Sequence, residues 1–161
     1  DDPRLDVRLV EGSNPMPVVF DAQLRTPASA QLFEVEDRQA PLIFHRSGAD
    51  LENAERLASV GATLEAVGTI EEKLDLALCL ERLHARGVRR LFVEGGPTLL
   101  SAFLERGLAD WLSVFVAPRV LGGGPSFCDA GFETVAAAFA LDGPAPVVLG
   151  SDVLFEGQPL R

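Results

Sequence analysis

The chain has no tyrosine, a single tryptophan and only two cysteines, Cys79 and Cys128. The cysteines are far apart in the sequence and have no metal-ligand residues beside them, which argues against a disulfide framework or a cysteine-held metal site. The pattern favours reduced thiols in a cytoplasmic protein. No apolar run reaches the length that spans a bilayer, and no basic segment followed by an apolar one opens the sequence. We therefore expect neither a membrane partner nor a secretory leader.

Basic residues are also scarce, since 14 lysines and arginines stand against 24 aspartates and glutamates, for a net charge of −10. Nucleic acids and anionic membranes need a basic face, so this balance argues against both as partners. An anionic small molecule can still bind where a few arginines cluster. The chain is rich in hydrophobic residues, at 47%, which is enough to bury the core of one domain over residues 1–161.

Apolar strands alternate with helical segments along most of the chain. We expect strands at residues 17–21, 41–45, 63–67, 88–93 and 111–118, and helices at residues 51–60, 69–86 and 97–106. This alternation is typical of βαβ units and predicts a mostly parallel central sheet flanked by helices. The C-terminal part differs, because Gly150, Ser151 and Asp152 lie between two apolar runs and predict an antiparallel hairpin. The fold class is therefore α/β with antiparallel C-terminal strands.

Two of these elements carry finer expectations. Thr69 and Glu72 have the spacing of a capping box, which places the start of the second helix at Thr69. Residues 111–118 are apolar on both sides of the period-two pattern, which is typical of a central strand.

A glycine turn joins the expected strand at 88–93 to the expected helix that starts at Pro97. Gly95 and Gly96 interrupt the apolar run, and proline suits a first helical turn, where its missing N–H is not needed. Such a turn directs unpaired N–H groups and the positive end of the helix dipole at a ligand, most often a phosphate. Glycines at a strand–helix junction also occur for geometry alone, and this alternative remains open. Glu94 would repel a phosphate, so we expect it to contact another part of the ligand.

Three motifs occur in order along the chain: Asp1–Arg8 (DDPRLDVR), Val93–Leu99 (VEGGPTL) and Ala117–Gly123 (APRVLGG). Together they resemble the reductase domain of the bifunctional riboflavin-biosynthesis deaminase/reductase, which has a dihydrofolate-reductase-like fold. The resemblance covers essentially the whole chain. It implies an oxidoreductase that uses NADPH to reduce a ribosylamino-pyrimidine 5′-phosphate, of the 5-amino-6-(5-phosphoribosylamino)uracil type, to its ribitylamino form.

The resemblance also implies roles for individual residues. A turn of five residues would hold the NADPH diphosphate through its main-chain N–H groups: Gly95, Gly96, Pro97, Thr98 and Leu99. Glu94, Leu5 and Arg8 would bind the substrate, and Asp1 would lie beside the nicotinamide. Hydride transfer to C1′ of the sugar needs positioned ligands and excluded water more than a strong acid or a metal, so no residue is assigned as catalytic and no metal is expected.

Arg46 and Ser47 follow the strand that passes the adenosine ribose in this fold, and we expect them to contact the 2′-phosphate of NADPH. An exposed polar turn without a ligand is the alternative. Asp21 and Ala22 lie at a strand end where relatives commonly have Asp-Ser. His45 and His84 have no partners in the sequence pattern and are expected to be structural.

Family members begin this domain with a further strand and often carry a deaminase domain before it. The sequence starts inside the reductase pattern, so we expect either that residues precede Asp1 in the full-length chain or that the chain is a piece lacking that strand. The resemblance further implies a homodimer. Two other functions remain open: a pterin or dihydrofolate reductase of the same fold, and a non-catalytic ligand-binding or dimerisation module.

Overall fold

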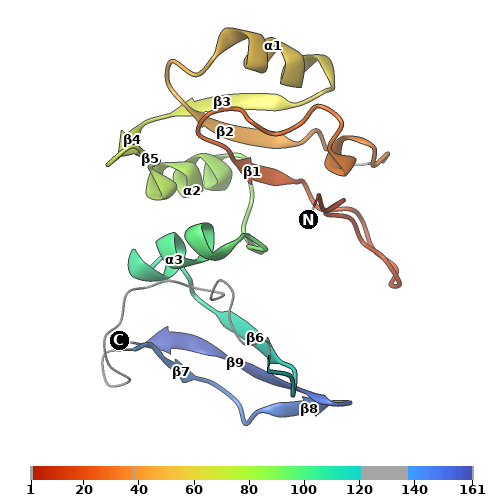
Figure 1. The fold of residues 1–161 in the computed structure, drawn as a ribbon, viewed down its shortest axis with the longest axis vertical. Coiled ribbons are helices and arrows are strands. Elements are labelled where there is room, and N and C mark those ends of the chain that lie inside the picture. Colours follow the sequence, from red (N-terminus) through yellow and green to blue (C-terminus); the bar gives the residue numbers. More distant parts are fainter. Residues whose placement is uncertain (1, 38, 121–137, 161) are drawn as a thin grey trace. The chain divides into compact units, whose positions relative to one another are not determined.

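The computed structural model describes residues 2–37, 39–120 and 138–160, and it divides into two compact units, residues 1–89 and 90–161 (Figure 1). Each unit has its own sheet. Asp1, the end of the third motif from residue 121 onward and Cys128 lie outside the described residues.

The first unit contains a parallel sheet of three strands in the order β1 (Val18–Phe20), β2 (Leu42–Arg46) and β3 (Thr63–Val67). Helix α1 (Leu51–Ser59) connects β2 to β3, and a short 3₁₀ helix, η1 (Gln31–Phe33), lies between β1 and β2. These three strands and α1 confirm the expected βαβ arrangement of the N-terminal half.

The core of the first unit forms around β2, whose first three residues are buried because strands pair with it on both sides. Ile43 packs against Leu24 and against Leu57 of α1, and all three side chains are fully buried. Phe44 points to the opposite face of the sheet, as successive residues in a strand do, and stacks on Phe20 with ring centroids 5.8 Å apart.

The second helix does not begin at Thr69. Residues Thr69–Ile70 and Lys73–Leu74 instead form a small antiparallel hairpin, β4 and β5, and helix α2 covers Leu76–Ala85. Glu71 and Glu72 at the hairpin turn both have positive φ, at 50° and 62°, which no helix accommodates. Asp75 caps α2 through its side chain, which accepts a hydrogen bond from the Leu78 N–H. The predicted capping box is therefore wrong.

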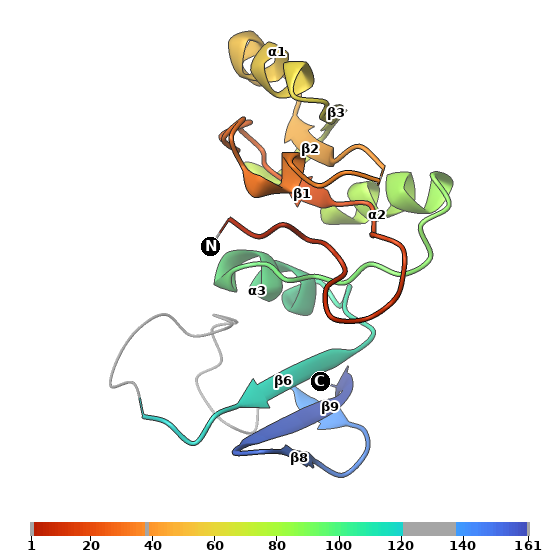
Figure 2. The same cartoon turned by 90° about the vertical axis from the view of Figure 1, so that its right-hand side faces the viewer.

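The second unit contains helix α3 (Pro97–Glu105) and an antiparallel sheet of β6 (Leu112–Val116), β7 (Ala140–Asp142), β8 (Val147–Leu149) and β9 (Asp152–Leu160). Strand β9 pairs with the other three and lies between β6 and β8 (Figure 2). The predicted hairpin is confirmed, since Leu149 pairs with Asp152 across a turn in which Gly150 has a φ of 65°.

Strand β6 is at an edge, because among the described residues it pairs only with β9. Its Phe115 is 65% exposed, so the expectation of a central strand is wrong. The apolar pattern on both faces is present, but the sequence does not specify how many neighbours a strand finds.

The apolar run at residues 88–93 does not form the expected strand. Across the described residues, the backbone groups of Arg90–Glu94 have no hydrogen-bond partner, and Phe92 is 80% exposed. The side chains from Leu91 to Gly96 alternate between half-buried and exposed, as in an extended chain. An apolar sequence favours a strand, but the strand forms only when a neighbour supplies the hydrogen bonds.

Candidate functional site: an amide turn and an arginine segment

Helix α3 starts at Gly96, whose backbone is extended, with φ −71° and ψ 176°, and Pro97 occupies the first turn. The N–H groups of Leu99 and Leu100 donate to the Gly96 carbonyl at 3.0 and 3.1 Å. The N–H groups of Gly95, Gly96 and Thr98 have no partner in the described part of the chain. We call these three N–H groups the amide cradle. Unpaired N–H groups at a helix N-terminus are suited to an anion, and the helix dipole adds to that preference.

The two glycines of the cradle differ in their surroundings. A Cβ on Gly95 would lie 2.6 Å from Leu99 Cδ2 and 2.9 Å from Leu99 Cβ, so Gly95 has no room for a side chain. A Cβ on Gly96 would have no atom within 4 Å. The space beside Gly96 is therefore open to a ligand, while Gly95 brings the backbone close to the helix.

The helix behind the cradle has well-defined ends. Ser101 is buried, and its hydroxyl donates to the Pro97 carbonyl at 2.7 Å. Gly107 follows the C-cap Arg106 with a φ of 63°, the left-handed conformation that ends many helices.

Glu94 immediately precedes the cradle and is exposed. Its carboxylate has no hydrogen bond or ion pair with the described residues, so it is available to accept a hydrogen bond from a ligand hydroxyl or amine. The structure thus brings six of the predicted site residues together in the second unit: Glu94, Gly95, Gly96, Pro97, Thr98 and Leu99.

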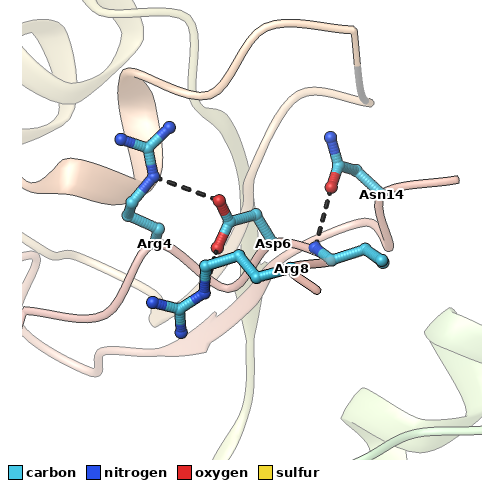
Figure 3. A network of polar contacts seen from close by, with 5 residues as sticks. Arg4, Asp6, Arg8 and Asn14 are labelled. Atoms are coloured by element: carbon cyan, nitrogen blue, oxygen red, sulfur yellow. Dashed lines mark hydrogen bonds and ion pairs between the residues drawn. The ribbon is translucent and has the colours of Figure 1, made fainter. Parts of the chain in front are cut away.

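Leu5 and Arg8 lie in the first unit, in an N-terminal segment without regular secondary structure. Figure 3 shows Arg8 with its neighbours. Leu5 has a φ of 53°, a conformation that is costly for a bulky residue and is found most often where a site constrains the backbone. Arg8 is 70% exposed and its Nε lies 3.2 Å from Asp6 Oδ1. Asp6 was not among the predicted site residues, although its position two residues before Arg8 could have identified it.

Arg46 and Ser47 lie at the end of β2, also in the first unit. The Arg46 N–H donates to the Ala22 carbonyl, and the guanidinium group lies 4.0 Å from the Glu72 carboxylate. Its buried Nε makes no hydrogen bond, while Ser47 is exposed. Because its one ion pair is long, the Arg46 guanidinium group can still bind an anion.

Asp21 ends β1 and has a structural role. Its carboxylate accepts hydrogen bonds from the Thr26 N–H and hydroxyl, both at 2.7 Å, and from the Gln23 N–H. Burial by itself would raise the pKa of Asp21, but these hydrogen bonds and one from the Arg25 backbone lower it overall. The carboxylate closes the loop that follows β1 and has little capacity left for a ligand.

The described residues offer neither a metal site nor a membrane-spanning helix. Among the described residues, no three histidine, cysteine or acidic side chains are grouped as metal ligands, and no helix is long and apolar enough to cross a membrane.

Cys79 is fully buried, and burial, with smaller effects from Asp75 and Glu65, raises the pKa of its thiol to about 12. It is a core side chain and not a nucleophile. His45 contacts the Arg46 carbonyl through Nδ1, and His84 is an exposed helix residue.

The model of the RibD C-terminal domain family matches residues 1–142. The chain is 37% identical over 162 residues to the 2,5-diamino-6-ribosylamino-4(3H)-pyrimidinone 5′-phosphate reductase of Methanothermobacter thermautotrophicus, covering 97% of this chain and 73% of that protein. The family resemblance predicted from the three motifs is confirmed.

Solved structures agree on the fold. The structure of Acinetobacter baumannii RibD matches 99% of this chain and 44% of its own, with a TM-score of 0.78 and 23% identity. The diaminohydroxyphosphoribosylaminopyrimidine deaminase/5-amino-6-(5-phosphoribosylamino)uracil reductase of Thermotoga maritima matches 99% of this chain and 42% of its own, with a TM-score of 0.73 and 23% identity. This likeness confirms the α/β fold of these reductase domains, and the chain spans less than half of either protein.

Proposed function

The chain belongs to the RibD C-terminal domain family, and from this premise we propose that it reduces the ribosylamino group of a pyrimidine 5′-phosphate to the ribitylamino form, with NADPH as the reductant. The observation that carries the proposal is the 37% identity to the archaeal reductase over nearly the whole chain. That relative acts, by its name, on the diaminopyrimidinone phosphate, so this compound is the first substrate to test. The uracil form is the second.

The amide cradle supports a dinucleotide as cofactor. Three N–H groups without partners among the described residues, next to open space at Gly96, suit the negative charge of a diphosphate. Gly95, Gly96 and Thr98 would donate to its oxygens. Pro97 has no N–H, and the Leu99 N–H already donates to the Gly96 carbonyl, so these two residues shape the turn. We assign the 2′-phosphate that distinguishes NADPH from NADH to Arg46 and Ser47, because a guanidinium group and a hydroxyl both donate to phosphate oxygens.

The reaction transfers a hydride and a proton. When bound, NADPH would supply the hydride for C1′ of the open-chain imine form of the sugar, and the proton on the attached nitrogen would come from water. Glu94 would orient the substrate by accepting hydrogen bonds from its hydroxyl or amine groups, and Leu5 and Arg8 would line the substrate pocket. Asp1 would lie near the nicotinamide. The protein then contributes position and exclusion of water, for which neither a metal nor a strong acid is needed.

A homodimer is part of the proposal. One face of the C-terminal sheet is wholly apolar where β6, β8 and β9 lie side by side: Val114, Val116, Val148, Val153 and Phe155. Val148 is 71% exposed and Val116 47%. An exposed apolar face of this kind suits a second copy of the same surface across a two-fold axis. We further propose a cytoplasmic location, and a deaminase domain as partner in proteins built like the Thermotoga enzyme.

The experiment is NADPH oxidation, followed at 340 nm, with the diaminopyrimidinone phosphate, the uracil phosphate and dihydrofolate offered separately. We expect turnover with one or both ribosylamino-pyrimidine phosphates and none with dihydrofolate. Turnover with dihydrofolate alone would support the pterin-type reductase instead. A folded protein that binds NADPH in calorimetry but turns over none of the three would contradict the reductase and favour a binding module.

A further inference from the structure

We propose that Asp6 is a positioning residue, which orients the guanidinium group of Arg8 to bind the phosphate of the substrate. The inference rests on the proposed function, because it assumes that the ligand carries a phosphate. It adds a residue to which neither the three motifs nor the resemblance assigned a role, and it gives Arg8 a defined partner within the ligand.

Asp6 lies between two arginines (Figure 3). Its Oδ2 accepts a hydrogen bond from Arg4 Nε at 3.1 Å, and its Oδ1 lies 3.2 Å from Arg8 Nε. The Asp6 side chain is only 10% exposed, whereas that of Arg8 is 70% exposed. The carboxylate is therefore sheltered while the guanidinium group it holds extends into solvent.

The manner of pairing leaves Arg8 able to bind. The Asp6–Arg8 contact at Nε is an ion pair without a hydrogen bond, since Asp6 Oδ1 has no hydrogen-bond partner among the described residues. Within the same ranges, no hydrogen bond engages the two terminal amino groups of Arg8. A guanidinium group binds a phosphate best through parallel N–H donors on one edge of its planar fork. The carboxylate thus holds one side of the group and leaves the outer amino groups for the ligand. Asp6, Arg8 and Leu9 also line a hollow in the surface.

The backbone around Asp6 is fixed by neighbouring contacts. The Val7 N–H donates to Asn14 Oδ1 at 2.9 Å, which closes the loop between them. Leu5 and Leu9 on either side both have positive φ, at 53° and 64°. A segment without a helix or strand is here held in one shape, so the Asp6–Arg8 pair can be ordered before any ligand arrives. Such preorganisation improves binding because less side-chain freedom is lost on association.

Glu65 also lies between two arginines, and its contacts provide a structural arrangement with which Asp6 can be compared. Glu65 Oε2 accepts from both Nε and Nη2 of Arg86, at 3.1 and 2.7 Å, and Glu65 Oε1 lies 3.6 Å from Arg82. Here the carboxylate occupies an edge of the Arg86 fork. Glu65 is also well sheltered, at 17% exposed, so it provides a matched control for Asp6.

The test compares Asp6→Asn with Glu65→Gln, using calorimetry to measure binding of the ribosylamino-pyrimidine phosphate and of its dephosphorylated riboside. We expect Asp6→Asn to weaken binding of the phosphate about tenfold, as for loss of one ordered charge-assisted hydrogen bond, and to leave the riboside unchanged. In the reductase assay KM should rise by a similar factor while kcat stays within about threefold. Glu65→Gln should change none of these values, and Asp6→Glu should restore part of the affinity.

Equal effects of Asp6→Asn on the phosphate and the riboside, or equal effects of Asp6→Asn and Glu65→Gln, would overturn the proposal. If Asp6→Asn fails to fold by its melting curve, Asp6→Glu decides, since it keeps the charge and changes only the geometry: it should weaken binding of the phosphate relative to wild type and leave the riboside unchanged, and an equal effect on both ligands would overturn the proposal. An inactive wild-type protein would overturn the proposed function, yet the binding comparison would still decide the role of Asp6.

Discussion

Gly95 and Leu99 lie so close together, one helical turn apart, that a single methyl group cannot be inserted between them. This contact brings the backbone before α3 close to the helix. Gly96, the next residue, has open space around it. The two glycines therefore have different roles, and substituting each in turn should have different effects on stability and on NADPH affinity.

Gly95→Ala should lower both stability and NADPH affinity. The new Cβ would displace Leu99, and overpacking of this kind costs about 1–3 kcal/mol in the free energy of unfolding, measurable by urea denaturation. Gly96→Ala should cost no more than about 1 kcal/mol as a helix-cap change, yet weaken NADPH binding because its methyl group enters the ligand's space. Gly68→Ala, also with no atom within 4 Å, is the control for both measurements. Normal NADPH affinity in Gly95→Ala would contradict the assignment of the cradle.

Glu94→Gln should lower kcat/KM for the pyrimidine phosphate about 10- to 100-fold, the range for loss of a charge-assisted hydrogen bond, and leave the NADPH dissociation constant within about twofold. The physical reason is that Glu94 is exposed and available beside the cradle but would repel a diphosphate. Glu105→Gln, at the other end of α3, is the control. A large loss of NADPH affinity in Glu94→Gln would place this residue on the cofactor instead.

Arg46→Ala should weaken NADPH about tenfold or more and leave NADH unchanged, because only NADPH carries the 2′-phosphate. The measurement is fluorescence titration of both nucleotides. Arg82→Ala, which removes a different surface arginine paired with Glu65, should change neither affinity. A parallel loss for NADPH and NADH would show that Arg46 does not select the phosphate.

Val148→Lys should shift the protein from dimer to monomer in sedimentation or light scattering, since a lysine ammonium placed in an apolar two-fold interface is desolvated without a partner. Val10→Lys is the matched control: Val10 is 73% exposed, close to the 71% of Val148, and belongs to the first unit. Dimerisation unchanged by Val148→Lys, or a wild-type protein that is already monomeric, would overturn the proposed interface.

Asp21→Asn should destabilise the protein by about 1–2 kcal/mol at neutral pH, as expected for weakened hydrogen bonds to a charged acceptor. The pKa of Asp21 is lowered in the folded state, so its stabilising effect is complete above the unfolded pKa and is lost as the pH falls through the folded one. The difference in free energy of unfolding between wild type and Asp21→Asn should therefore shrink from pH 6 toward pH 3. A constant difference over that range would contradict the role of the charge.

The sequence by itself determined the features that depend on neighbouring residues. The start of α3 at Pro97, its end before Gly107 and the hairpin turn at Gly150 all follow from restrictions on φ, which act within a few residues. The alternation of strands with helices predicted the parallel sheet of the first unit, and three ordered motifs identified the family.

Only the tertiary structure decided the features that depend on distant partners. An apolar run became strand β6 where β9 supplied hydrogen bonds, and the run at residues 88–93 remained irregular where no described residue did. The second helix begins at Leu76, after the cap residue Asp75, because Glu71 and Glu72 form a turn. Likewise, the shelter of Asp6 and the exposure of Arg8 depend on how the chain folds around them, since burial and charge pairing are properties of the packed molecule.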